Sequence, residues 1–166
     1  VSMRFLDEIT KIDKSTGNII WRFGGKNCRN NEFRYLNDTI NGFYGFSHQH
    51  SINILPNGNI LLFDNGNYKP VEYSRAVEYE MDYTLKTAKK VWEYRNNPDY
   101  FVTSMGSARR LINGNSVISF GSLKYNTRVL EVKPDNTIAF KLNYLGDKLQ
   151  SFFNATRYIT KMNAVY

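Results

Sequence analysis

Two stretches of the chain share one pattern: Leu55-Pro56-Asn57-Gly58-Asn59 and, 56 residues further on, Leu111-Ile112-Asn113-Gly114-Asn115. Each stretch joins two strand-like runs, which are residues 49–55 and 60–64 in the first case and residues 105–111 and 116–121 in the second. Asn-Gly is a strong hairpin signal, because both central residues of a type I′ turn need a positive φ. The sequence therefore predicts two β-hairpins that repeat one turn.

A second pair of stretches repeats with nearly the same spacing. Ser74-Arg75-Ala76-Val77 and Thr127-Arg128-Val129-Leu130 lie 53 residues apart, and each begins a further strand-like run. A period of this size, with four strands in each unit, is typical of a β-propeller. We therefore expect an all-β chain that forms one partial β-propeller domain over residues 1–166, with fewer than four four-stranded blades.

The expected blades are unequal in length. They comprise the end of one blade (7–23), two full blades (49–94 and 105–142) and the start of a further one (154–162). A propeller ring must close to remove its open strand edges. We therefore expect the chain to be a piece of a longer protein. Residues 26–46 form a polar and aromatic loop, and a loop of that length is usually functional or mobile.

Composition excludes several classes of function. Lys and Arg number 22 against 15 Asp and Glu, a net charge of +7, but the basic residues are scattered and form no recognition motif. We expect no nucleic-acid partner; the charge indicates either a mildly cationic surface or a positive field that attracts small anions. No apolar run approaches the roughly 18 residues of a membrane span. The single cysteine, Cys28, forms no internal disulfide, no Cys/His spacing suggests a metal, and we expect no cofactor.

Several segments, in this order, resemble the arylsulfotransferase family of six-bladed β-propellers. They are residues 8–25, Phe46-Ser-His-Gln-His-Ser51, Leu55-Pro-Asn-Gly-Asn-Ile-Leu-Leu-Phe-Asp-Asn-Gly66, Ser74-Arg-Ala-Val-Glu-Tyr79, Val91-Trp-Glu-Tyr94 and Gly106-Ser-Ala-Arg-Arg-Leu111. The resemblance covers residues 2–142. It implies transfer of a sulfuryl group from a phenolic sulfate ester to a phenol through a histidine relay, and a periplasmic or extracellular location. The partners implied are small phenolic sulfates and phenols, and a homo-oligomer is left open.

The resemblance also implies roles for named residues. His50 would donate a hydrogen bond or a proton to the phenolic oxygen, and Arg75 would clamp the sulfuryl anion. His48 and Arg109 are the expected substrate-binding residues. The family's covalent nucleophile is a later histidine, but no histidine follows His50, so the nucleophile is not identifiable in this sequence.

Structural alternatives stand beside these roles. His50 shares the parity of Ile52 and Ile54, so it could be a hydrogen-bonded histidine between two blades. Arg75 could instead form a salt bridge with Asp64 or Glu78. A non-catalytic propeller that binds a ligand or a protein is the alternative function, and a quinone-dependent dehydrogenase is a weaker one. The stretch Asp64-Asn65-Gly66-Asn67 resembles part of a calcium loop but lacks the later carboxylates, which favours a turn.

Overall fold

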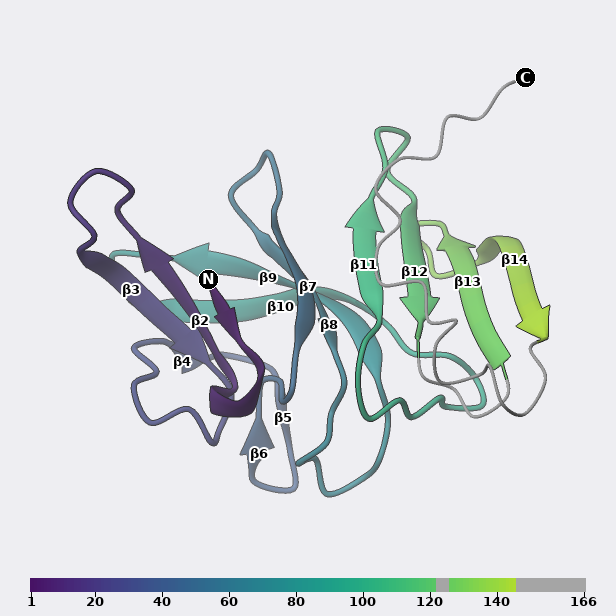
Figure 1. Cartoon of the computed structure of the whole chain (residues 1–166), viewed down its shortest axis with the longest axis horizontal. Helices are drawn as coiled ribbons and strands as arrows, with labels where there is room; N and C mark the ends of the chain where they lie inside the picture. Colours follow the sequence, from purple (N-terminus) through teal and green to yellow (C-terminus); the bar gives the residue numbers. More distant parts are fainter. Residues whose placement is uncertain (122–125, 146–166) are drawn as a thin grey trace.

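A computed structural model describes residues 1–121 and 126–145, and the start of a further blade expected at 154–162 lies outside them. The described residues form an all-β protein with three larger sheets side by side, antiparallel except for one strand pair, and a separate two-stranded sheet (Figure 1). They contain one short 3₁₀ turn and no α-helix, so none of their helices is long and apolar enough to span a bilayer.

The middle sheet contains the first predicted hairpin. Its strands β7 (His50–Ile54), β8 (Ile60–Asp64), β9 (Arg75–Asp82) and β10 (Thr87–Tyr94) follow one another as antiparallel neighbours. β8 is buried along its whole length, which explains its apolar run over residues 60–63. The four strands begin and end within a residue or two of the predicted runs.

The turn between β7 and β8 differs from the prediction. Gly58 has a φ of 86°, but Asn57 is not among the residues with positive φ, so the turn is not type I′. The Gly58 N–H donates to the carbonyl of Leu55 at 2.9 Å, as in a type I turn. Pro56 suits this turn, because its ring restricts φ to negative values at the first central position.

The third sheet repeats the middle one. It consists of β11 (Ser107–Arg110), β12 (Ser116–Phe120), β13 (Asn126–Val132) and β14 (Ile138–Leu145), again as antiparallel neighbours in chain order. The turn before β12 has the same geometry, with Gly114 at a φ of 85° and its N–H on the carbonyl of Leu111 at 3.1 Å. The predicted repeat of one hairpin turn is therefore present.

The first sheet is smaller. It contains β1 (Ser2–Met3), β2 (Glu8–Ile12) and β3 (Ile19–Gly24), with the 3₁₀ turn η1 (Arg4–Leu6) between the first two strands. The hairpin β2–β3 matches the prediction, whereas β1 and η1 were not anticipated.

The long loop at residues 26–46 is more ordered than its composition indicates. It contains β4 (Arg34–Tyr35), which pairs in parallel with the outer strand β10, and a small hairpin of β5 (Thr39–Ile40) and β6 (Phe43–Tyr44). The parallel pairing makes the middle sheet five-stranded.

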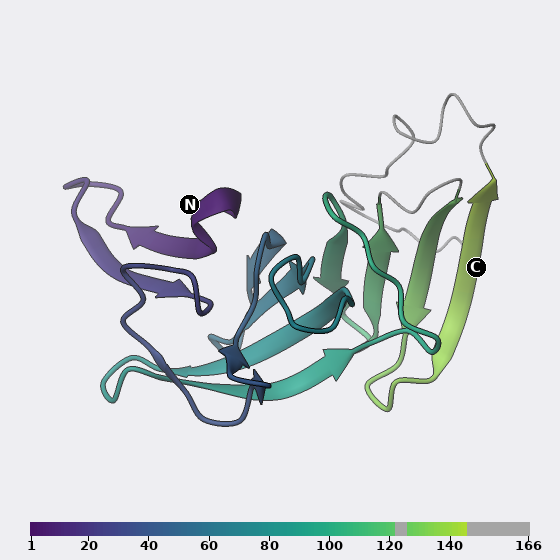
Figure 2. The same ribbon diagram turned by 90° about the horizontal axis from the view of Figure 1, so that it is seen from below.

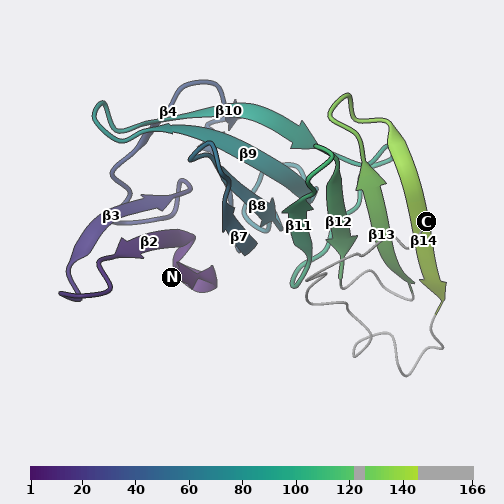
Figure 3. The ribbon, with the colours of Figure 1, turned by 90° about the horizontal axis from the view of Figure 1, so that it is seen from above.

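Two apolar clusters hold the sheets together. One joins the first and middle sheets around Phe23, Phe46 and Tyr79, and the other joins the middle and third sheets around Phe63, Ile118 and Phe120. Figures 2 and 3 show the three sheets following one another in chain order, with β7 and β8 beside β11. Packing of neighbouring sheets therefore brings the first strands of the middle and third sheets close together.

Candidate functional site

A bulge in β7 sets the direction of His50. The pairing with β8 runs from His50 opposite Phe63 to Asn53 opposite Leu61, so β7 has one extra residue between them. Ser51 lies within the bulge at a φ of 54°. The bulge breaks the alternation that would have placed His50 on the face of Ile52 and Ile54, and bulges of this kind commonly redirect a side chain beside a functional site.

Both ring nitrogens of His50 have partners. Nδ1 lies 2.7 Å from Oδ1 of Asn65 and 3.1 Å from the carbonyl oxygen of His48. The N–H of Met105 donates to Nε2 at 3.3 Å. The imidazole is thus held between the end of β8 and the loop that leads into β11.

Residues with a left-handed backbone are concentrated around this imidazole. His48, Ser51 and Met105 have φ values of 55°, 54° and 63°. Each is a non-glycine residue that adjoins or contacts His50, and such conformations cost of order 1–3 kcal/mol each. Strain of this kind gathers at sites whose geometry matters for function, which supports His50 as the centre of the candidate site.

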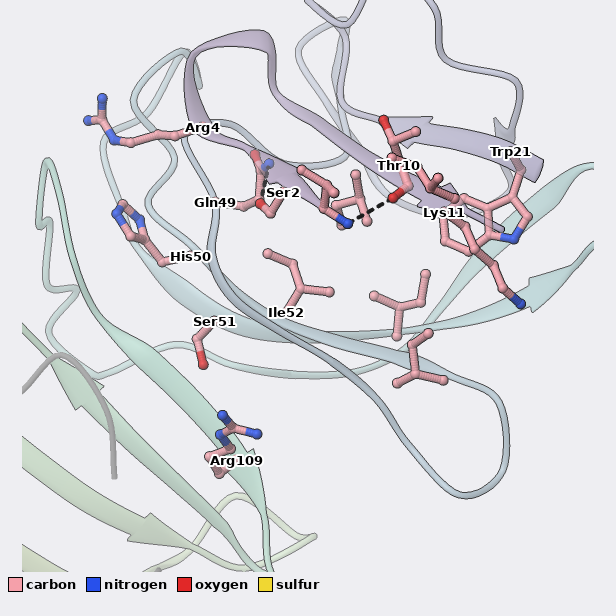
Figure 4. A pocket seen from close by; sticks show the side chains of 15 residues that line it. Ser2, Arg4, Thr10, Lys11, Trp21, Gln49, His50, Ser51, Ile52 and Arg109 are labelled. Carbon is pink, nitrogen blue, oxygen red and sulfur yellow. Dashed lines mark hydrogen bonds between the residues drawn. The ribbon is translucent and has the colours of Figure 1, made fainter. Parts of the chain in front are cut away.

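Residues of all three sheets line one cavity of about 670 Å³ beside His50. Figure 4 shows His50, Ser51 and Arg109 near one end of it, with Arg4 above them and Trp21 and Lys11 at the other end. Between the ends the wall is largely apolar and includes Ile9, Ile52, Ile54 and Ile60. None of the described residues that line the cavity is an Asp or a Glu. The cavity therefore offers positive charge and apolar surface together.

Two arginines, Arg4 and Arg109, line the end of the cavity that lies beside His50. Arg109, on β11, donates from Nη1 to the side-chain oxygen of Asn53, and Arg4 donates from Nη2 to the carbonyl of Thr103 at 2.7 Å. The Nε of each is buried and has no hydrogen-bond partner among the described residues. Both side chains line the cavity and carry a positive charge, which suits a small anion held by charge-assisted hydrogen bonds. The sequence indicated Arg109 as a substrate-binding residue but not Arg4. Arg4 belongs to the turn η1, which was not predicted.

His48 lies apart from the cavity lining. Its ring packs between Phe5 and Tyr68, with centroid distances of 5.7 and 4.6 Å. Its backbone N–H donates to the Asp7 carboxylate at 2.6 Å, and its Nδ1 is 3.3 Å from the same oxygen. Burial raises the pKa of Asp7 to about 6 and lowers the pKa of His48, since neither charged form is well solvated there. The structure thus surrounds His48 with protein groups.

Arg75 is also away from the cavity. Its side chain is 1% exposed, and every guanidinium nitrogen already donates to the protein. Its acceptors are Asp38, Asp64, Glu93, Tyr79 and the carbonyl of Gly45. The Asp64 partner expected from the sequence is present, while Glu78 pairs with Arg110 at 2.5 Å. In this arrangement no Arg75 donor is left for a substrate anion.

Two residues that hold His50 were not anticipated as site residues. Met105 gave no sequence signal, because only its backbone N–H is used. Asn65 could have been found as the amide that directly follows β8, but the sequence pattern indicated only a turn. Among residues 1–121 and 126–145, no group of three or more His, Cys, Asp or Glu side chains could hold a metal ion.

The fold and the cavity together define an all-β protein with a cavity that combines positive charge and an apolar wall. The chain belongs to the arylsulfotransferase family, since the family model described as Arylsulfotransferase (ASST) matches residues 1–162. Among curated proteins no relative matches the chain.

Proposed function

We propose that the protein transfers a sulfuryl group from a phenolic sulfate ester to a phenol and that the cavity beside His50 binds the ester. The observation that carries this proposal is the combination of two arginines, an apolar wall and no lining carboxylate among the described residues of one cavity. Arg4 and Arg109 would bind the sulfate, and the isoleucines would contact the aromatic ring. Family membership supports the same substrate class.

His50 is the residue we assign to proton exchange at the phenolic oxygens. In the first half-reaction the S–O bond to the donor phenol breaks, and protonated His50 gives its proton to the leaving phenolate. In the second, the acceptor phenol returns a proton to His50 as its oxygen forms the new S–O bond. The sulfuryl group is carried between the two steps by a nucleophile that is neither His48 nor His50.

We further propose that the three sheets are successive blades of a six-bladed propeller. The antiparallel order within each sheet and the side-by-side packing of β7, β8 and β11 support this arrangement. The cavity residues His50 and Arg109 come from β7 and β11, which begin the two four-stranded repeats, and first strands face the axis of a propeller. The family also supports export to the periplasm or the cell exterior.

One observation favours a second function. Both ring nitrogens of His50 and all donors of Arg75 are engaged by protein groups. A propeller that binds an aryl anion without turning it over would show the same pattern, with the cavity as its binding site.

Acceptor-dependent release of p-nitrophenol tests the proposal. The protein, as its source organism makes it, would be mixed with p-nitrophenyl sulfate, with and without a second phenol. We expect release that requires the phenol and is lost in His50→Gln but kept in His48→Gln. Binding of p-nitrophenyl sulfate without release would establish the second function, and neither binding nor release would refute both.

A further inference from the structure

We propose that Asn65 is a positioning residue that holds His50 in the Nδ1–H tautomer and leaves Nε2 as the nitrogen that exchanges protons. The part about proton exchange rests on the proposed function, whereas the tautomer follows from local geometry alone. Asn65 directly follows β8 and is fully buried.

The orientation of the Asn65 amide follows from its own partners. Nδ2 donates to two backbone carbonyls, those of Val102 at 2.8 Å and Met105 at 2.9 Å. An amide turned the other way would place its oxygen against both carbonyl oxygens, with no hydrogen between these three acceptors. The side-chain oxygen of Asn65 must therefore face His50.

This orientation determines where the imidazole carries its proton. Nδ1 of His50 faces two oxygens that can only accept, Oδ1 of Asn65 and the backbone carbonyl of His48. Nε2 faces the N–H of Met105, which can only donate. A neutral imidazole has one donor and one acceptor nitrogen, so the proton is on Nδ1 and the lone pair on Nε2.

The arrangement exists before any substrate binds. Asn65 is anchored through its backbone as well, because its carbonyl accepts a hydrogen bond from the Ser74 hydroxyl at 2.8 Å. The Ser74 hydroxyl in turn accepts the N–H of Val102 at 3.0 Å, which ties down the loop that carries Met105. A group that orients the far side of a catalytic imidazole also raises the basicity of the nitrogen that reacts.

An amide suits this position better than a carboxylate. Asp at residue 65 would lose both donors and would place negative charge beside Nδ1. That charge favours the imidazolium form, so the pKa of His50 rises. Asn67 provides a matched control, since its Nδ2 donates to the carbonyl of Thr103 in the same loop at 3.0 Å without an interaction with His50.

Nitrogen NMR of the imidazoles tests the assignment. The ring signals that a ¹⁵N-labelled His50→Gln variant lacks, compared with the ¹⁵N-labelled wild type, are those of His50. We expect a pyrrole-type Nδ1 and a pyridine-type Nε2 above the pKa of His50. In Asn65→Asp we expect the titration midpoint of His50 to move to higher pH by about one pH unit. The pH profile of p-nitrophenol release should move with it, while Asn67→Asp leaves both in place.

The outcomes separate this inference from the proposed function. A pyridine-type Nδ1, or an equal mixture of tautomers, in the otherwise native protein overturns it even if Asn65→Asp fails to fold. An unshifted midpoint in folded Asn65→Asp overturns it as well. The expected tautomer and shift without any sulfuryl transfer would uphold the role of Asn65 and reject the proposed function.

Discussion

The guanidinium of Arg75 and the carboxylate of Asp38 form a buried bidentate salt bridge. Nη1 donates to Oδ1 at 2.9 Å and Nη2 to Oδ2 at 2.7 Å. Burial alone would raise the pKa of Asp38, but the charge and the hydrogen bonds of Arg75 bring it below its usual value. Asp38 belongs to the loop before β7 and Arg75 begins β9, so this pair fastens the loop to the middle sheet.

Removing the Arg75 charge should lower the free energy of unfolding. In Arg75→Met, Asp38 and Asp64 keep their charge but lose their main partner in a buried region. Breaking a buried pair from one side costs about 3–5 kcal/mol, and urea unfolding would measure the loss. Lys86→Met, at a pair whose two side chains are 39% and 36% exposed, should cost less than about 1 kcal/mol.

The Arg75 variant also distinguishes a structural from a catalytic arginine. If Arg75 clamped the sulfuryl group instead, Arg75→Met would retain its stability and lose only its activity. That result would contradict the placement of Arg75 described above.

Arg109 and its neighbour on β11 should differ sharply in their effect on substrate binding. Arg109 faces the cavity, whereas Arg110 bonds to Glu78 and lies over the ring of Trp92. Arg109→Gln removes a charge-assisted hydrogen bond to the sulfate, so its KM for p-nitrophenyl sulfate should rise about tenfold or more. Arg110→Gln makes the same chemical change on the other side of the strand and should leave KM unchanged. Equal effects from both would show that Arg109 acts only through the net charge.

The contribution of Asp7 to the free energy of unfolding should fall as the pH rises. Its pKa is raised by burial from 3.8 to about 6, so between these values the folded protein binds more protons than the unfolded chain. The stability contributed by the protonated form is therefore present below about pH 4 and is lost as the pH passes about 6. The free energy of unfolding of Asp7→Asn should rise relative to that of the wild type by up to about 3 kcal/mol over this window, because the amide carries no charge at any pH.

Urea unfolding at a series of pH values checks the Asp7 prediction. Asn tolerates the left-handed backbone of this residue, whose φ is 49°, so the substitution adds no strain. A constant difference between the two proteins at all pH values would contradict the raised pKa.

Gly106 should be far less replaceable than Gly58. Both have positive φ, of 100° and 86°. A Cβ on Gly106 would lie 2.4 Å from the ring of Phe63, whereas a Cβ on Gly58 would meet nothing within 4 Å. Gly58→Ala should cost about 1 kcal/mol from its backbone alone, and Gly106→Ala a further 1–3 kcal/mol from overpacking. Thermal unfolding would compare them, and similar losses would show that Phe63 moves aside freely.

Local signals predicted most of the strands. Alternation and the two Asn-Gly turns located the hairpins β2–β3, β7–β8 and β11–β12, because both strands of a hairpin lie close in sequence. The pairing of β4 with β10 was missed, since it joins residues more than 50 positions apart through only two register pairs. No local pattern encodes such a contact.

The candidate site was predicted in part. His50 and Arg109 do lie near one end of a common cavity, but Arg4, Asn65 and Met105 were missed. The reason is physical: a bulge redirects β7 at Ser51, and two partners of His50, Asn65 and Met105, lie 15 and 55 residues later in the chain. Strand parity cannot anticipate a bulge, and a backbone donor such as Met105 leaves no mark in the sequence.

The short parallel strand β4 also has a consequence for solubility. The outer edge of β10 would otherwise present a row of unpaired amides and carbonyls, which is a template for intermolecular strand addition. Arg34 and Leu36 donate their N–H groups to carbonyls of Lys86 and Ala88, and the Asn37 amide forms hydrogen bonds with both backbone groups of Lys90. Loop residues 34–37 thereby cover the outer edge of the middle sheet and block aggregation through it.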